Sequence, residues 1–338
     1  MSQPEQMISE PQGLAALAAR LAIAPAVGLD TEFLRERTYR AELCLLQLAD
    51  AHGPVCVDPL ALAQLAPLGA VLGAGGPVKV MHACRQDIEV LLPAVGMVQP
   101  VFDTQIAAAL AGMPAQVGYA ELVRRILGRD LSKAHTRTDW SRRPLSAEQL
   151  DYALDDVRYL PALREHLLAE LGRMGRLEWL AEELAGLACA AAYAVDPESA
   201  WQKVRSLRGL DPDRARLAQM LAAWRERRAA ERNRPRGWIL DDGALREIVL
   251  RAPHTAEDLA AVRELPAGFI KHSGAQILAL VHSAAVPAQL PRPPRRGAPD
   301  PARTAAARKL GAVLQAAAGE LALSPEILAT RRDLEALA

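Results

Sequence analysis

The chain has 338 residues, a length that predicts two or three domains and at least one sizeable core. Hydrophobic residues make up 51% of it and charged residues 24%, the balance of an ordinary water-soluble globular protein. The formal net charge is zero, so total charge says nothing about a nucleic-acid partner, and only the distribution of charge along the chain can.

Local composition excludes three further classes of protein. No uninterrupted run of about 18 apolar residues exists, so no membrane span is expected. The N-terminal stretch carries Glu5, Glu10 and Arg20, which is not the pattern of a secretory signal, and we therefore expect a cytoplasmic protein. The cysteines include no C-x-x-C pair, and we interpret them as buried reduced thiols rather than as a disulfide framework or a zinc site. They are Cys44, Cys56, Cys84 and Cys189.

The first 60 residues predict one helix and three strands. Residues 9–22 place leucines on one face of a helix, and residues 26–33, 43–48 and 55–57 are apolar segments typical of strands. The links between the strands are short, and residues 50–53 form a turn, so the three strands should form an antiparallel meander.

After the meander, strands alternate with helices. We expect helices over residues 61–72, 85–92 and 104–111 and strands over residues 78–82 and 100–102. This alternation predicts a mixed sheet covered by helices. The glycine-rich residues 73–76 follow a helix and precede a strand, the reverse of the order in a phosphate-binding loop, so we interpret them as a helix-ending turn.

The remainder of the chain is predicted to be helical. A helix should begin at Ser146, where Gln149 completes a capping box, and Pro161 should kink or end it. From about residue 170 to 286 every strong pattern is helical, and the proline- and arginine-rich stretch that follows is typical of an extended linker.

Asp30 and Glu32 form the first candidate site. They lie two residues apart on a predicted buried strand, so their side chains point to the same face. Two carboxylates in an apolar strand are costly unless a hard cation such as Mg²⁺ compensates them. At the end of a strand, however, both acids could reach solvent, and the pair alone leaves the two interpretations open.

Other acids have ordinary structural explanations when each is taken alone. Asp87 follows a predicted strand and would stabilise a helix N-terminus, and Asp103 is interpreted as a helix N-cap. Tyr152 and Asp156 are four residues apart on a predicted helix and share one face, which could simply be solvated.

The combination of these residues is more specific than its parts. It consists of D-x-E on a strand, an aspartate after a later strand and Y-x-x-x-D on a helix. This arrangement resembles the DEDD superfamily of 3′→5′ exonucleases in its tyrosine variant, and within it the ribonuclease D family. The matching segments are residues 27–33 (VGLDTEF), 82–87 (HACRQD), 137–145 (RTDWSRRPL) and 152–156 (YALDD).

The resemblance implies a fold and a reaction. The fold is the α/β RNase H-like one, a mixed sheet flanked by helices, over about residues 20–170. The reaction is hydrolysis of RNA 3′ ends to nucleoside 5′-monophosphates, with two divalent metal ions (Mg²⁺ or Mn²⁺) as cofactors and tRNA precursors as the typical substrate. The implied metal ligands are Asp30, Glu32, Asp87 and Asp156, and Tyr152 would orient the attacking water.

The resemblance also selects between two adjacent acids. Neighbouring residues diverge by about 100° around a helix, so a rigid site can hardly use both Asp155 and Asp156, but this geometry does not choose between them. The resemblance does, because the family spacing implies a ligand four residues after Tyr152, at Asp156. Asp155 should then be solvated or pair with Arg158, three residues further on.

The C-terminal part resembles the helicase-and-RNase-D C-terminal domain, called HRDC. Residues 200–205 and 221–232 carry this likeness, and the domain should be all-α. We therefore expect an exonuclease domain at 1–170, a helical connector at 171–199, an HRDC domain at 200–286, a Pro/Arg-rich linker at 287–301, and a partial second HRDC-like segment at 302–338. So short a final segment should either be disordered or dock on the rest.

Charge distribution indicates where RNA could bind. Residues 201–240 hold eleven Lys or Arg and four Asp or Glu, which favours an RNA-backbone surface, although an arginine-rich helix can be merely solvated. The tryptophans in this stretch, Trp201, Trp224 and Trp238, are interpreted as core residues.

In the exonuclease domain, His82, Lys133 and Arg137 are weaker candidates for contacts to phosphates, with surface solvation as the alternative for each.

Two other functions remain open. A DNA 3′→5′ exonuclease would use the same ligands, and only a contact to a 2′-OH would discriminate it. A non-catalytic RNA-binding adaptor could be built on an inactive nuclease, but all four carboxylates and the tyrosine are present, which argues against it. We expect no membrane partner and favour a monomer, although the sequence does not reveal the oligomeric state.

Overall fold

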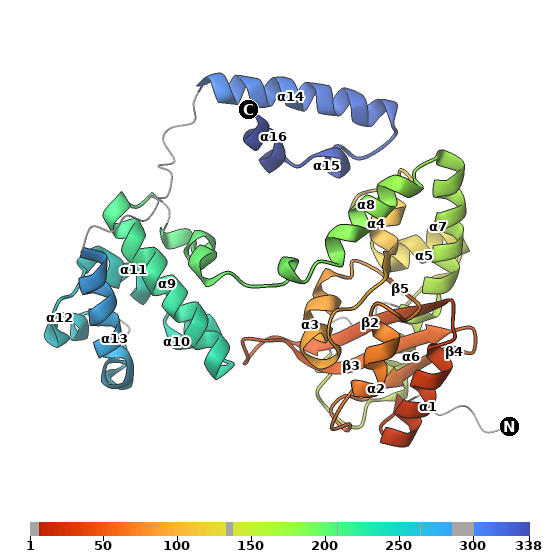
Figure 1. Cartoon of the computed structure of the whole chain (residues 1–338), viewed down its shortest axis with the longest axis horizontal. Helices are drawn as coiled ribbons and strands as arrows, with labels where there is room; N and C mark the ends of the chain where they lie inside the picture. The colour runs from red at the N-terminus through yellow and green to blue at the C-terminus, as the bar shows by residue number, and fades with distance from the viewer. Residues whose placement is uncertain (1–6, 133–137, 208, 264, 286–300) are drawn as a thin grey trace. The chain divides into compact units, whose positions relative to one another are not determined.

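The computed structural model describes residues 7–132, 138–207, 209–263, 265–285 and 301–338. The chain forms two compact units (Figure 1). Unit 1 contains Met1–Leu34, Ala41–Tyr193 and Pro301–Ala338, and unit 2 contains Arg35–Arg40 and Ala194–Asp300. The expected linker at 287–301 lies, except for its last residue, outside the described residues.

Unit 1 is built around a six-stranded mixed sheet with the strand order β1-β4-β3-β2-β5-β6. The strands are β1 (Met7–Ile8), β2 (Ala26–Leu34), β3 (Glu42–Asp50), β4 (Gly53–Val57), β5 (Val78–Met81) and β6 (Val101–Asp103). As predicted, β2, β3 and β4 form an antiparallel meander. The pairs β2–β5, β5–β6 and β1–β4 are parallel. The two-residue β1 is too short to show a sequence pattern and was not predicted.

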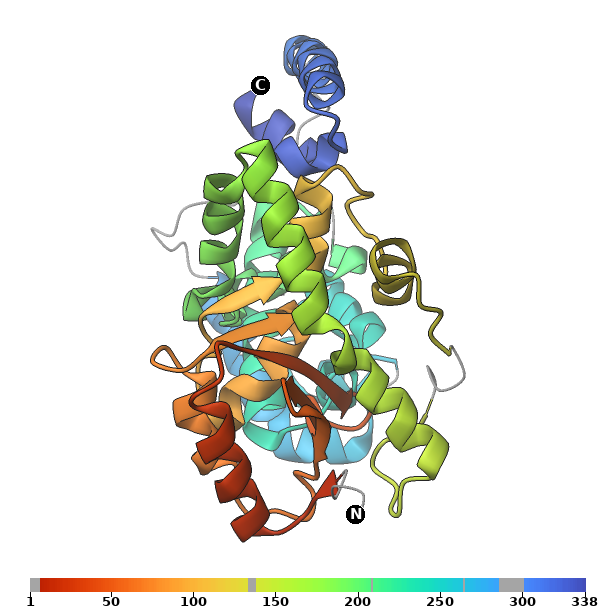
Figure 2. The same cartoon turned by 90° about the vertical axis from the view of Figure 1, so that its right-hand side faces the viewer.

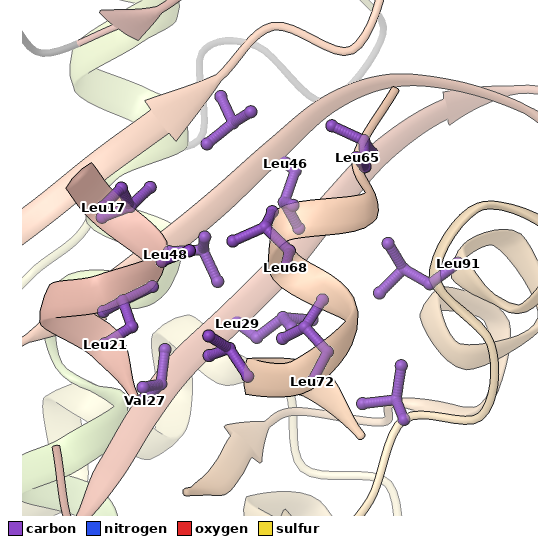
Figure 3. Close-up of a cluster of buried hydrophobic side chains, with 14 of the residues drawn as sticks. Leu17, Leu21, Val27, Leu29, Leu46, Leu48, Leu65, Leu68, Leu72 and Leu91 are labelled. Atoms are coloured by element: carbon purple, nitrogen blue, oxygen red, sulfur yellow. The ribbon is translucent and has the colours of Figure 1, made fainter. Parts of the chain in front are cut away.

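One face of the sheet is covered by α1 (Pro11–Leu21), α2 (Ala66–Leu72) and α3 (Arg85–Val95). Leucines from α1 and α2 pack there against Leu29 of β2 and against Leu46 and Leu48 of β3 (Figure 3). Successive strand residues point to opposite faces, so the residues flanking these leucines point to the other side of the sheet.

The predicted helix at 61–72 is shorter than expected. It begins at Ala66, because Pro67 suits only the first turn of a helix, and the residues before it form turns. It ends at Leu72, and Lys79, which is fully buried, donates from Nζ to the carbonyl oxygens of Val71 and Gly73. The glycine-rich turn therefore ends a helix, as predicted.

The opposite face is covered by α4 (Thr104–Leu110), α5 (Tyr119–Leu127), α6 (Ala147–Arg158) and α7 (Leu160–Met174), with α1 and α6 on opposite sides of the sheet (Figure 2). The predicted capping box of Ser146 and Gln149 starts α6. Pro161 lies in the first turn of α7, so the long helix is divided there as expected. The strand β2 approaches this layer closely at Gly28, where a Cβ atom would lie 2.9 Å from the carbonyl oxygen of Val157.

The C-terminal segment docks on unit 1. It consists of α14 (Pro301–Glu320), α15 (Pro325–Leu328) and α16 (Arg331–Leu337). The guanidinium of Arg176, just before α8 (Leu177–Leu187), donates to the carbonyl oxygens of Leu110 and Leu321, both at 2.6 Å. Ile327 packs against the core between the sheet and α7. Of the two outcomes expected for residues 302–338, docking is the one observed.

Unit 2 is all-α. Its main helices are α9 (Pro212–Arg232), α10 (Arg236–Ile239), α11 (Asp242–Arg251), α12 (Ala256–Ala260) and α13 (Ala267–Ala285). Two short 3-10 helices of this unit, η2 (Pro197–Lys203) and η3 (Arg205–Leu207), lie before them, and η1 (Ala190–Ala192) belongs to unit 1. Trp201 and Trp224 contact the core of this unit as expected. The prediction is wrong for Trp238, whose exposed fraction is 61%, because the four-residue α10 is too short to bury it.

The four cysteines are all free thiols. Cys44, Cys56 and Cys84 are buried free thiols, whereas Cys189 is exposed, so the interpretation of all four as buried was wrong for Cys189, which lies between α8 and η1. In the described part of the chain, no helix is long and apolar enough to span a membrane.

Candidate active site

The acids of β2 lie on the face of the sheet that α6 covers. Leu29 and Thr31 flank Asp30 and point the other way, into the layer of α1 to α3. Asp30 and Glu32 therefore share the opposite face, as the sequence predicts, and both side chains are half-buried.

Asp87 lies in the first turn of α3 and is 8% exposed. Its Oδ1 accepts a hydrogen bond of 2.5 Å from the hydroxyl of Thr31 on β2. The acid thus stabilises a helix N-terminus, its ordinary structural role, and also belongs to the acidic cluster, because it raises the pKa of Asp30. The two interpretations of Asp87 are compatible.

The start of α3 is held by Asp103. This carboxylate is the N-cap of α4, as predicted, and accepts from the backbone N–H groups of Gln105 and Ile106 at 2.8 and 3.2 Å. It also accepts from the backbone N–H groups of Ala83 and Cys84, at 3.2 and 2.8 Å, just before α3. Ala83 has φ of +54°, a left-handed conformation unusual for alanine, and this contact helps to hold it.

The helix α6 brings in Tyr152 and Asp156. Asp156 raises the pKa of both Asp30 and Glu32, so its carboxylate lies close to theirs. Burial and then the charges of Asp156, Glu32 and Asp30 raise the pKa of Tyr152. The ring of Tyr152 stacks on the ring of Trp140, with centroids 6.2 Å apart. This approach of helix to strand requires the absence of a side chain at Gly28.

Asp155 points elsewhere. Its Oδ1 accepts from Nε of Arg158 at 2.7 Å, the ion pair that the sequence predicts, and both side chains are at least 36% exposed. Its backbone oxygen accepts from the hydroxyl of Tyr119 at 2.9 Å, which fixes this turn of α6 against α5.

Burial and mutual repulsion disfavour ionisation of the clustered acids. Burial, followed by repulsion from Asp156 and Asp87, raises the pKa of Glu32 to about 8. Burial and then the charge of Asp155 raise the pKa of Asp156 to about 7. The pKa of Asp30 is well above its ordinary value, mainly because of burial and then because of the three neighbouring acids. Burial raises the pKa of Asp87 to about 6, although the Thr31 hydrogen bond opposes this.

The donor set suits a hard divalent cation. All of these groups offer oxygen atoms, which Mg²⁺ and Mn²⁺ prefer, and positive charge among them would relieve the repulsion. Among the described residues, no three acidic, histidine or cysteine side chains already surround one point as ligands.

Several residues that position the site were missed in the sequence. Thr31 is one of them, and the contact of Asp103 with the start of α3 is a second, because only the N-cap role of Asp103 was predicted. A third is Arg143, which donates to both carboxylate oxygens of Asp58 at 2.6 and 2.7 Å and to the carbonyl oxygen of Trp140 at 2.9 Å. These hydrogen bonds hold the backbone at Trp140, whose ring stacks against that of Tyr152. Arg143 lies within the family-like segment 137–145, but its partner Asp58 lies 85 residues away in the chain.

The structure does not favour His82 as a phosphate contact. Its Nδ1 lies 2.9 Å from Oγ1 of Thr104, and its Nε2 lies 3.0 Å from the carbonyl oxygen of Val117. Burial lowers its pKa, so it is neutral and both ring nitrogens are engaged within the protein. Lys133 and Arg137, the other two candidates, lie outside the described residues.

Comparisons with known proteins agree with this geometry. Residues 5–172 match the family model of a 3′→5′ exonuclease, and residues 214–281 match that of the HRDC domain. The chain is 44% identical to ribonuclease D of Acidiphilium cryptum, over all of this chain and 87% of the relative. It is 43% identical to ribonuclease D of Jannaschia sp., over 96% of this chain and 86% of the relative.

A solved structure is similar over nearly the whole chain. The crystal structure of Escherichia coli RNase D matches with a TM-score of 0.88 and 32% identity, covering 98% of this chain and 89% of that one. The fold class and the enzymatic function expected from the sequence are thereby confirmed, and the adaptor alternative is not supported. The chain belongs to the ribonuclease D family of 3′→5′ exoribonucleases.

Proposed function

We propose that the acidic cluster binds two divalent metal ions, Mg²⁺ or Mn²⁺, and hydrolyses the terminal phosphodiester of RNA there. Asp30, Glu32, Asp87 and Asp156 would hold the ions. The observation that carries this proposal is the convergence of these acids from β2, α3 and α6, where burial and mutual repulsion also raise their pKa values and a bound cation would relieve the repulsion. When bound, the ions would supply the positive charge that phosphodiester hydrolysis needs.

The protein's own groups would orient the reactants. The pKa of Tyr152 is raised, first by burial and then by the neighbouring acids, so its hydroxyl stays protonated and can donate a hydrogen bond. Its position beside Asp156 and Glu32 suits the orientation of an attacking water. Stacking on Trp140 would limit movement of the ring.

The proposed substrates are RNA 3′ ends, with tRNA precursors as the class expected from the family. The Escherichia coli relative is "an exoribonuclease involved in structured RNA processing", which supports structured RNA in general as the substrate. The test is Mg²⁺- or Mn²⁺-dependent release of mononucleotides from a 3′-labelled RNA, with single-stranded DNA of the same sequence beside it. Equal rates on both would favour the DNA exonuclease alternative.

Unit 2 would supply a surface for the RNA backbone. Arg232 and Arg234 are exposed and make no ion pair among the described residues. The guanidinium of Arg234 lies 5.8 Å from the ring centre of the exposed Trp238. Exposed arginine beside exposed tryptophan suits an RNA strand, because the arginines attract phosphates and the indole can stack on a base.

This surface is tested with the double variant Arg232→Ala/Arg234→Ala. Each lost phosphate contact should flatten the log–log salt dependence of RNA binding by roughly 0.7–0.9. Arg227→Ala is the matched control, because Arg227 lies on the same helix but pairs with Glu198. An unchanged salt slope would place the RNA surface elsewhere, while loss of nuclease activity on a dinucleotide would indicate damage to the fold.

We also expect the protein to act as a monomer in the cytoplasm. Sedimentation of the purified chain at several concentrations tests the first expectation, and fractionation of cells that express it tests the second.

A further inference from the structure

Gln47 is a fully buried polar residue in the middle of β3, with 0% of its surface exposed. Neither Nε2 nor Oε1 of its side chain has a hydrogen-bond partner among the described residues. Its neighbours along the strand, Leu45, Leu46, Leu48 and Ala49, are all apolar. Because buried polar groups are nearly always paired, this amide needs an explanation other than packing.

The register of the sheet places Gln47 beside the acidic cluster. Its partner residue on β2 is Asp30, and its partner on β4 is Cys56. Residues directly opposite one another on neighbouring antiparallel strands point to the same face, with Cβ atoms about 4.5–5.5 Å apart. Leu46 and Leu48 belong to the core on the α1 to α3 side, so Gln47 and Asp30 both face α6.

The strand register places one acid, Asp30, directly opposite Gln47. On the α6 side, the buried neighbours of β3 and β4 form an apolar cluster that includes Leu45, Cys56, Ala153 and Leu154. An apolar side chain would fill such a place without loss of hydrogen bonds. The amide therefore stands between an apolar cluster and the carboxylate of Asp30.

We propose that Gln47 is a positioning residue of the metal site, which donates from Nε2 to the carboxylate of Asp30 and fixes its orientation when this carboxylate binds a cation. This inference rests on the proposed metal-dependent function. A carboxylate ligand has lone pairs to spare for such a donor, and residues that hold ligands in this way typically contribute about 10–100-fold to metal affinity or activity. In the metal-free protein the same amide lowers the stability of the fold, because it is buried and unpaired.

The test compares Gln47→Met with the wild-type chain. Methionine keeps the length of the side chain and removes its hydrogen-bonding groups. Binding of Mn²⁺ is measured by electron paramagnetic resonance in the absence of RNA, and thermal melting is measured in EDTA. We expect Mn²⁺ affinity about 10–100-fold lower, together with an unchanged or higher melting temperature of the metal-free protein.

Cys56→Ala is the matched control. Cys56 is equally buried and lies on the same face, on the other side of Gln47 from Asp30. This variant should lower the melting temperature by loss of packing and leave Mn²⁺ affinity within about threefold, well below that range.

The outcomes separate this inference from the proposed function. Normal Mn²⁺ affinity in Gln47→Met, with a wild-type chain that binds Mn²⁺, would overturn the role of Gln47 alone. A lower melting temperature with unchanged affinity would show that the amide is structural. A wild-type chain that binds no Mn²⁺ would overturn the proposed function and this inference together.

Discussion

The hydroxyl of Thr31 donates a 2.5 Å hydrogen bond to Oδ1 of Asp87 and joins the centre of β2 to the first turn of α3. Thr31 lies between Asp30 and Glu32 in the chain, so one residue links the two acids of the strand to the acid of the helix. The pair is buried, and a hydrogen bond to a carboxylate there is expected to contribute about 1.5–3 kcal/mol.

The first prediction concerns this hydrogen bond. Thr31→Val keeps the branched shape and removes the hydroxyl, so Asp87 loses a partner that opposes the rise of its pKa. Turnover should fall about 10–100-fold, as for other residues that orient ligands, and the pH at which activity appears should rise. Thr31→Ser, which retains the hydroxyl, should stay close to wild type. Identical pH–rate profiles for the two variants would contradict the prediction.

The second prediction concerns the acids of β2. Asp30→Asn and Glu32→Gln should each abolish hydrolysis, because a neutral amide is a poor ligand for a hard cation. Their metal-free melting temperatures should be unchanged or slightly raised, since each change relieves the repulsion within the cluster. Near-normal turnover of either variant would be incompatible with the proposed metal site.

The third prediction concerns the tyrosine of α6. Tyr152→Phe removes only the hydroxyl and keeps the stacking on Trp140, so the fold and the metal affinity should persist. Turnover should fall by about 10²–10⁴-fold, the usual contribution of a group that orients or transfers a proton. If single-turnover rates stay within about threefold of wild type, well below that range, Tyr152 is structural.

The fourth prediction separates two adjacent acids. Asp156→Asn should inactivate the enzyme, because Asp156 lies in the cluster. Asp155→Asn removes only an exposed ion pair with Arg158, which is worth about 0–1 kcal/mol. Release of mononucleotides by both variants at saturating Mg²⁺ checks this. An inactive Asp155→Asn with an active Asp156→Asn would reverse the assignment.

The fifth prediction concerns pH. In the folded metal-free protein the pKa is raised to about 8 for Glu32, about 7 for Asp156 and about 6 for Asp87. In the unfolded chain these carboxyl groups have their ordinary, lower pKa values. Above those ordinary values the folded protein therefore still binds protons that the unfolded chain has released. Between about pH 4 and 8 the cluster's contribution to metal-free stability should therefore fall as pH rises.

Metal binding should show the opposite trend, because a cation must displace these protons. Mn²⁺ affinity should rise between pH 6 and 8, with release of protons, which calorimetry in two buffers of different ionisation enthalpy can measure. Glu32→Gln should flatten the upper part of this profile. A pH-independent affinity over this window would show that the acids are already ionised.

Much of the local structure was readable from the sequence because it depends on contacts within a few residues. The capping box at Ser146, the division of the helix near Pro161 and the N-cap at Asp103 each depend on groups a few positions apart. Strand periodicity likewise placed Asp30 and Glu32 on one face. Where the local signal was weak or misread, as in the start of α2 at Ala66, the prediction was wrong.

The sequence by itself thus predicted the type of most major elements, although not of α5, together with the meander and the acids proposed for the site. Only the tertiary structure decided which groups surround those acids. Thr31 and Asp87 are 56 residues apart, and the second role of Asp103 spans 19 and 20 residues, to Cys84 and Ala83. The amide of Gln47 is unpaired, and its proposed role follows only from the strand register, which places it opposite Asp30. Hydrogen bonds and desolvation depend on distances between residues in space. The periodic pattern of one segment does not show which distant segment will pack against it.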